Sequence, residues 1–155
     1  DLRKSKALPK IDTLLVAPAL HCRQTAGILF PGLEYSICQL EEIDFGIFGG
    51  KNAGGLIGCK EYGAWLDTGC MGDIPGGGSV KQFKDNSCGV FKQILETSSP
   101  GVTAIVAHGG NIMAILEKFV LPQKGFFDYR LPNAGFILCR LEEGALYIES
   151  MANPG

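Results

Sequence analysis

The order of apolar runs and helical stripes along the chain predicts alternating strands and helices. Residues 11–17 and 102–107 are β-branched, apolar runs that suit buried strands. Residues 21–29 and 111–119 follow these runs after short turns and carry apolar side chains at helical spacing. Two strand-turn-helix units in one chain predict an α/β fold.

The remaining pattern adds a short strand, a long helix and a closing hairpin. Gly89 interrupts the long helix at a cost of about 1 kcal/mol relative to alanine. The turn of the hairpin is predicted at Glu142-Glu143-Gly144. The predicted bounds are 5–8 for the tail of an initial helix, 34–40 for the short strand, 79–97 for the long helix, and 135–141 and 145–150 for the hairpin.

Residues 46–79 hold most of the glycines and are predicted to form an irregular insertion, which acts as a lid. One helix is expected near residues 61–66, and Pro75-Gly76-Gly77-Gly78 is a plain loop. Tyr62 and Trp65 either line a binding site or fill a small core of the insertion itself, and the sequence leaves both open.

Composition predicts a single domain over residues 1–155. The chain is 46% hydrophobic and 19% charged, which is typical of one soluble domain with a sizeable core. A net charge of −2 with scattered lysines gives no basic stripe, so nucleic acid is not an expected partner. No apolar segment is long enough to cross a membrane, and the first ten residues are not signal-like. We therefore expect a cytoplasmic protein with no membrane partner.

The six cysteines show no C-x-x-C pair, and the chain has only two histidines to complete a metal site. The sequence therefore predicts no metal centre. Without a signal segment the cysteines are expected to be reduced and partly buried rather than a disulfide framework.

His108 is the first functional candidate. It ends the apolar run at residues 102–107 and stands before Gly109 and Gly110, where a helix begins. Ligands of open α/β sheets bind beyond the carboxyl ends of the strands, and a helix start offers N–H groups to an anion. The alternative is that His108 is a turn histidine with a structural role.

Four segments in order along the chain, together with a late turn, resemble the histidine phosphatase superfamily in its phosphoglycerate-mutase-like and α-ribazole-phosphatase-like branch. The resemblance extends from about residue 2 to residue 148. The matching segments are 17–26 (similar to SPLxRxxQTA), 40–46 (LxExDFG), 75–79 (PGGES), 107–112 (SHGGxI) and 133–135 (the late Asn-Ala/Cys-Ser turn).

This resemblance implies a three-layer α/β/α fold of the phosphoglycerate mutase type, with a mostly parallel sheet. It implies hydrolysis of a small phosphomonoester through a phosphohistidine, without a metal or organic cofactor. His108 is then the second histidine of the site, which donates to phosphoryl oxygens. Glu42 is the acid that protonates the leaving alkoxide, and the N–H groups from Gly109 onward complete the anion site.

The sequence departs from the family at chemically important positions. It contains no LxRHG motif, which carries the nucleophilic histidine, so a truncated and inactive chain is expected. His21 stands where the family has its second phosphate-binding arginine, which weakens phosphate binding because imidazole lacks the fixed charge and planar fork of a guanidinium. Other departures are Ala17, Gly49, Gly78 and Asn86.

The LxRHG segment is the first central strand in the family, and the resemblance places it beside the strands that end at Ala17 and Ala107. Its absence is expected to leave two unpaired edges and a marginally stable chain.

Two hypotheses for function stay open. The first is a phosphatase or phosphomutase acting on a small phosphorylated metabolite. The second is a non-catalytic relative or a decaying copy, which at most binds a phosphorylated ligand or partner. At the residue level, His21 is either a substituted phosphate contact or a surface histidine, and Glu42 is either the catalytic acid or a solvated loop acid.

Overall fold

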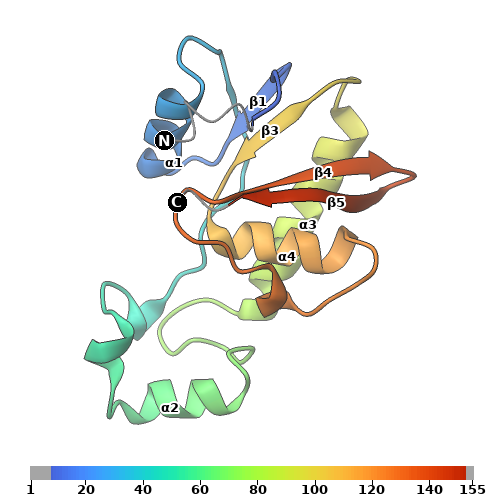
Figure 1. The fold of residues 1–155 in the computed structure, drawn as a ribbon. Helices are drawn as coiled ribbons and strands as arrows, with labels where there is room; N and C mark the ends of the chain where they lie inside the picture. Colours follow the sequence, from blue (N-terminus) through green and yellow to red (C-terminus); the bar gives the residue numbers. More distant parts are fainter. Residues whose placement is uncertain (1–7, 153–155) are drawn as a thin grey trace. The chain divides into compact units, whose positions relative to one another are not determined.

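The computed structural model describes residues 8–152, whose contacts divide the chain into two compact units. Unit 1 comprises the described residues up to Glu41 together with those from Ser87 onward, and unit 2 is residues 42–86. Figure 1 shows the elements: β1 (Thr13–Val16), α1 (Leu20–Leu29), β2 (Ser36–Ile37), the 3-10 turns η1 (Gly46–Phe48) and η2 (Ala53–Leu56), α2 (Lys60–Asp67), α3 (Val80–Thr97), β3 (Thr103–Val106), α4 (Gly109–Phe119), the 3-10 turn η3 (Phe126–Tyr129), β4 (Phe136–Glu142) and β5 (Ala145–Ala152).

A parallel three-stranded sheet with the order β2-β1-β3 organises unit 1. The register aligns Thr13 with Thr103 and Val16 with Val106, so β1 and β3 end at the same edge. The N–H of Ala17 extends this pairing by donating to the carbonyl of Val106 at 2.8 Å. The turns after the two strands, and the helices that follow them, therefore begin side by side.

The expected unpaired edge on the strand that ends at Ala17 is wrong. β1 pairs with β2 on one side and with β3 on the other. The physical reason is that the strands ending at Ala17 and Ala107 are direct neighbours, and their backbone hydrogen bonds leave no room for a strand between them.

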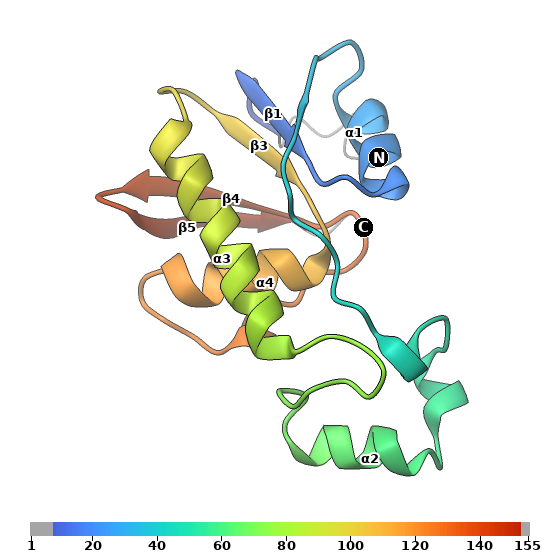
Figure 2. The ribbon, with the colours of Figure 1, turned by 180° about the vertical axis from the view of Figure 1, so that it is seen from behind.

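β4 and β5 form a separate antiparallel hairpin (Figures 1 and 2). Glu143 and Gly144 connect the strands with φ values of 50° and 77°, as a two-residue turn of type I′ requires. A bridge between Val120 and Leu146 joins the end of α4 to β5. The predicted hairpin is thus confirmed.

Helices enclose the strands of unit 1 around one apolar core. α1 contacts β1 and β3, α4 contacts β5, and α3 passes behind the strands in Figure 1 and in front of them in Figure 2. The rings of Phe91 on α3 and Phe119 on α4 meet edge to face, with centroids 4.9 Å apart. Val16 is fully buried at the centre of this core.

Unit 2 has its own small core, which contains Phe48, Leu56, Ile74 and Val80. Phe48 contacts the rings of Tyr62 and Trp65, with centroid distances of 5.3 and 5.6 Å. The Trp65 indole N–H donates to the carbonyl of Gly72 at 2.9 Å. The structure thus shows that Tyr62 and Trp65 fill the small core of the insertion, which is one of the two roles that the sequence leaves open.

Two sequence motifs of unit 2 form one backbone arrangement. The N–H of Gly78 donates to the carbonyl of Asp44, and the N–H of Ile47 donates to the carbonyl of Pro75. Gly46 has a φ of +48°, and a Cβ there would lie 2.3 Å from the carbonyl oxygen of Pro75. Only glycine fits this close approach.

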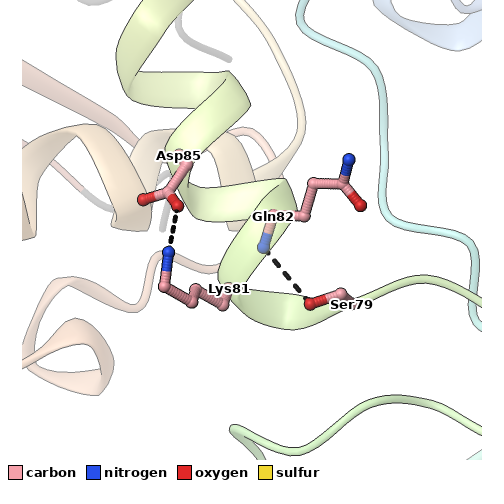
Figure 3. Close-up of polar contacts among 4 residues, drawn as sticks. All are labelled: Ser79, Lys81, Gln82 and Asp85. Carbon is pink, nitrogen blue, oxygen red and sulfur yellow. Dashed lines mark hydrogen bonds and ion pairs between the residues drawn. The ribbon is translucent and has the colours of Figure 1, made fainter.

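The start of α3 follows directly from the second of these motifs (Figure 3). The Ser79 hydroxyl accepts from the N–H of Gln82 at 3.4 Å, which helps to satisfy the first turn of the helix. Lys81 and Asp85, four residues apart, form an exposed ion pair of 2.6 Å. The predicted helix at residues 79–97 is confirmed.

Most other predicted elements are also confirmed, with shifted ends. α4 begins at Gly109 rather than residue 111, because His108 has extended backbone angles and precedes the first helical turn. The predicted strand at residues 34–40 is reduced to Ser36–Ile37. Residues 5–7 of the predicted initial helix lie outside the described residues. Between residues 8 and 152, no helix combines the length and apolar character that a bilayer crossing needs.

Candidate functional site

His108 lies where β3 ends and α4 begins, as the sequence predicts. Its backbone is extended (φ −73°, ψ 151°), and its carbonyl accepts the first helical bond from the N–H of Ile112 at 3.1 Å. The side chain is only 8% exposed. Gly109, the predicted backbone donor, is the first residue of α4.

His21 and Cys22 approach His108 from the neighbouring strand-helix turn. Both belong to the first turn of α1, which begins shortly after β1 ends. The parallel pairing of β1 with β3 places this turn beside the start of α4. His21 is exposed and Cys22 is buried, so the three side chains extend from the surface into the core.

The two histidine rings make a direct contact. Nε2 of His21 lies 3.2 Å from Nδ1 of His108, and the ring planes meet at 72°. One nitrogen must donate and the other accept, because two N–H groups cannot face each other at this distance. Sγ of Cys22 lies 3.9 Å from Nε2 of His108, on the other side of the ring. His21 is therefore a surface residue that also contacts His108. A surface position and a role as a phosphate contact, the two alternatives for His21, do not exclude each other.

The electrostatic environment at this contact favours an anion. Neither α1 nor α4 has a side-chain hydrogen bond at its N-cap or an acidic residue in its first turn. The first N–H groups of a helix have no partner within the helix and carry the positive end of its dipole. α4 also has a basic residue, Lys118, in its last turn, as the dipole prefers. Two such helix starts meet at His21 and His108.

Asn111, in the first turn of α4, fixes the backbone around the site. Its Nδ2 donates to the carbonyl of Glu41 and to the hydroxyl of Ser87, both at 3.0 Å. Glu41 and Ser87 are the residues at which the chain leaves and re-enters unit 1. The side chain is 1% exposed, and its Oδ1 finds no hydrogen-bond partner among residues 8–152. One amide thus holds both ends of the chain segment that forms unit 2.

Glu42, the predicted acid, is the first residue of unit 2 and has an exposed side chain. It follows directly on Glu41, whose carbonyl accepts from Asn111. The structure describes the two units individually. The role of Glu42 as a proton donor therefore stays a prediction.

Sequence reasoning missed two of the residues around His108. The sequence indicates no chemical role for Cys22, because the chain has no C-x-x-C pair and only two histidines. Asn111 is part of the motif at residues 107–112, and an asparagine in the first turn of an apolar helix indicates a local polar function. The adjacent pair His21-Cys22 was the available signal for the first of these.

Three ligand atoms, one each from His21, Cys22 and His108, lie within 4.8 Å of one another. Spacing along the sequence gave no sign of this cluster, since 86 residues separate Cys22 from His108. None of the six cysteines forms a disulfide within the described part of the chain. The Cys22 side chain is thus present as a thiol next to two imidazoles.

The comparisons with known proteins agree with the fold. The model of the histidine phosphatase superfamily (branch 1) matches residues 3–154. A search of curated proteins finds no match.

Solved structures match with a high share of both chains covered. An Escherichia coli protein named for a proposed α-ribazole-5′-P phosphatase activity has a TM-score of 0.81 at 14% identity, over 92% of this chain and 73% of its own. The α-ribazole phosphatase of Shigella flexneri has a TM-score of 0.79 at 15% identity, over the same shares. The product of an open reading frame of Mycobacterium tuberculosis has a TM-score of 0.70 at 20% identity, over 91% and 72%. At these sequence identities, the structural similarity shows a shared fold and nothing further.

Proposed function

Because the chain belongs to the histidine phosphatase superfamily, we propose that its site at His108 binds the phosphoryl group of a small phosphomonoester and serves the hydrolysis of that ester. The observation that carries this proposal is the meeting of two uncapped helix starts at the His21–His108 contact. A phosphate dianion matches the N–H groups and the dipoles that converge there.

In this proposal each residue of the site has a distinct role in binding. The N–H groups from Gly109 onward donate to phosphoryl oxygens, and the His108 imidazole donates another hydrogen bond. His21 supplies a further donor in place of the guanidinium that the family has. An imidazole contributes less than a bidentate guanidinium, so phosphate binding is weaker than in relatives with arginine.

The proposed reaction has two steps. An imidazole nitrogen attacks phosphorus while the bond to the ester oxygen breaks, and the leaving oxygen takes a proton from the carboxylic acid of Glu42. Water then attacks phosphorus, which breaks the P–N bond, releases phosphate and regenerates the imidazole. Neither His21 nor His108 stands in an Arg-His-Gly sequence, so the proposal assigns the attacking nitrogen to neither. The 155 residues by themselves are thus expected to bind phosphate without turnover.

A second candidate is a protein that binds a phosphorylated ligand or partner and has no catalytic role. The observation that favours it is His21 itself, because an enzyme that must stabilise a phosphoryl transition state loses a permanent charge there. The two candidates share the same binding site and differ only in turnover.

The test combines phosphate binding with turnover. Calorimetric titration of the 155-residue protein with inorganic phosphate should show binding that His108→Ala abolishes. His21→Arg should tighten this binding by about tenfold, since a charge-assisted bidentate pair replaces an imidazole. Undetectable binding in both the parent and His21→Arg would contradict the proposal.

Turnover is then measured with p-nitrophenyl phosphate, in this chain and in a version extended by an upstream strand that ends in Arg-His-Gly. Hydrolysis only in the extended version supports the phosphatase. Hydrolysis by the short chain that is lost in His108→Ala would show that the account of the nucleophile is wrong. Phosphate binding without hydrolysis in either version supports the second candidate.

A further inference from the structure

We propose that His21, Cys22 and His108 form a binding site for Zn²⁺, with a fourth position open to water or to an anionic oxygen. The proposal concerns a cation held by side chains. It therefore stands independently of the phosphate site proposed above, although the two share His21 and His108.

The chemical types of the three ligands suit zinc. Two imidazoles and one thiolate are ligands that zinc prefers, and three protein ligands with one open position are typical of zinc sites that bind water or substrate. Within residues 8–152 this is the group of histidine, cysteine and acidic side chains whose donor atoms converge closely enough to hold an ion. It unites both histidines of the chain with a cysteine from the same helical turn as His21.

The distance between the two histidine nitrogens that face each other matches what a tetrahedral ion requires, and the thiol lies within reach of the same position. Zinc bonds of about 2.0–2.1 Å to nitrogen and about 2.3 Å to sulfur place ligand atoms roughly 3.3–3.6 Å apart. Nε2 of His21 and Nδ1 of His108 are 3.2 Å apart, which matches this spacing. The 3.9 Å from Sγ of Cys22 is measured to the other ring nitrogen of His108, Nε2, and one ion binds only one of the two nitrogens. All three ligand atoms lie within 4.8 Å of one another, so a contraction of about 1 Å completes the site.

The backbone holds the ligands in place without the ion. His21 and Cys22 are consecutive residues of α1, and His108 is fixed by the pairing of β3 with β1. Cys22 and His108 are 3% and 8% exposed, so neither must be ordered from solvent when the ion binds. His21 is exposed and leaves a path for entry.

Zinc binding at these three side chains exchanges protons for the ion. The ion replaces the proton that lies between the two imidazole nitrogens, and it displaces the proton of the thiol. Zinc binding therefore releases protons, and it weakens as the pH falls.

Cobalt provides a direct readout of the thiolate ligand. Co²⁺ added to the metal-free protein should give the absorption band of a thiolate-to-cobalt charge transfer together with the visible bands of a tetrahedral ion, and Zn²⁺ should displace both. Cys22→Ala should lose the charge-transfer band. Cys38→Ala is the matched control, because Cys38 is a buried cysteine of the same core at 7% exposure and lies outside the cluster.

Variants of His21 test the site without disturbing the core. Because this side chain is exposed, His21→Ala should keep the melting temperature of the metal-free protein but lose the increase that Zn²⁺ produces in the parent. Its zinc affinity should fall by more than about tenfold, since even ligand-orienting partners contribute that much. His21→Arg should also lose zinc binding while it gains phosphate binding, so the two proposals predict opposite effects for one substitution.

Three results would overturn the proposal. One is the absence of a charge-transfer band in the parent protein, and another is a band that Cys22→Ala leaves unchanged. The third is equal zinc affinity in the parent and in His21→Ala. If the parent protein showed both cobalt bands but did not bind phosphate, only the phosphate site would be contradicted.

Discussion

Unit 1 and unit 2 each contain one residue predicted to be catalytic, His108 and Glu42, but the two units build the surrounding backbone by different means. In unit 1 the pairing of β1 with β3 aligns the ends of two strands and therefore the starts of two helices. In unit 2 two glycine-rich turns exchange hydrogen bonds, and backbone approaches backbone at Gly46 without an intervening side chain. The first arrangement tolerates varied side chains, whereas the second depends on their absence.

The largest expected effect comes from removing one buried phenylalanine from each unit. Phe91→Ala and Phe48→Ala should each cost about 3–5 kcal/mol, because both rings are almost fully buried (6% and 4% exposed) and both contact another aromatic ring. Urea unfolding measures the loss. Hydrogen exchange should locate the change in unit 1 for Phe91→Ala and in unit 2 for Phe48→Ala. If Phe48→Ala deprotected β1 and β3 as strongly as Phe91→Ala does, the comparison of two separate cores would be wrong.

Gly46→Ala should lower the free energy of unfolding by about 3 kcal/mol. A loss of this size would show that unit 2 depends on close backbone contact, whereas unit 1 is built on paired strands. The new Cβ would meet the Pro75 carbonyl at 2.3 Å, at a φ of +48° that alanine rarely adopts. Gly50→Ala is the control, since its φ is +71° but nothing lies within 4 Å. It should cost only about 1 kcal/mol, the conformational penalty alone. If Gly46→Ala and Gly50→Ala lost equal stability in urea, the close backbone approach at Gly46 would not explain the loss.

Asn111→Ala should cost about 2 kcal/mol, because the side chain donates to both ends of the segment that forms unit 2. Asn133→Ala, at an exposed position, serves as the control and should change stability by less than about 0.5 kcal/mol. Thermal unfolding of the two variants gives the comparison. A neutral Asn111→Ala would show that the two hydrogen bonds do not hold the segment ends.

The smallest effect is a pH dependence in unit 1. Burial, together with the charge of Glu149, raises the pKa of the Cys139 thiol to about 11. A raised pKa stabilises the folded protein below the ordinary thiol value of 9.0, and this contribution is lost as the pH rises from there towards 11. The loss should stay below about 1 kcal/mol, because Cys139 is only partly buried.

Chemical denaturation of the parent and of Cys139→Ala between pH 8 and about 11 measures this difference. The variant should show a flatter curve over that range. Alkylation at neutral pH gives a second readout, in which Cys139 should react more slowly than Cys59 of unit 2. Reaction of both thiols at the same rate would contradict the effect of burial.

The sequence predicted the elements of unit 1 better than their contacts. Local patterns were sufficient for α1, α3, α4 and the hairpin, because apolar spacing and turn residues act over a few positions. The order of the strands was not accessible in this way, and the strands ending at Ala17 and Ala107 turned out to be neighbours. The same limit hid Cys22, whose partner His108 is adjacent only through that strand pairing.

In unit 2 the sequence indicated a loop but not its internal order. Glycine content predicts irregular backbone, and it does not indicate which turns hydrogen-bond to each other. The pairing of the turn at Asp44 with the turn at Gly78 is visible only in the structure. The packing of Trp65 against Phe48 likewise depends on contacts between 3-10 turns and α2 that have no periodic signature.

The pairing of β1 with β3 also has a consequence for how the molecule folds. Thr13 and Thr103 meet only after a long stretch of chain has been closed into a loop, and all of unit 2 lies within that stretch. Loop closure of this length must precede the contacts that compensate for it, so parallel pairing is slow and comes late. A unit 2 that folds first, around its own core, shortens the flexible part of the loop and lowers the entropy cost of the step that assembles His21 with His108. We therefore expect the rate at which the site forms during folding to depend on a segment that contributes neither histidine.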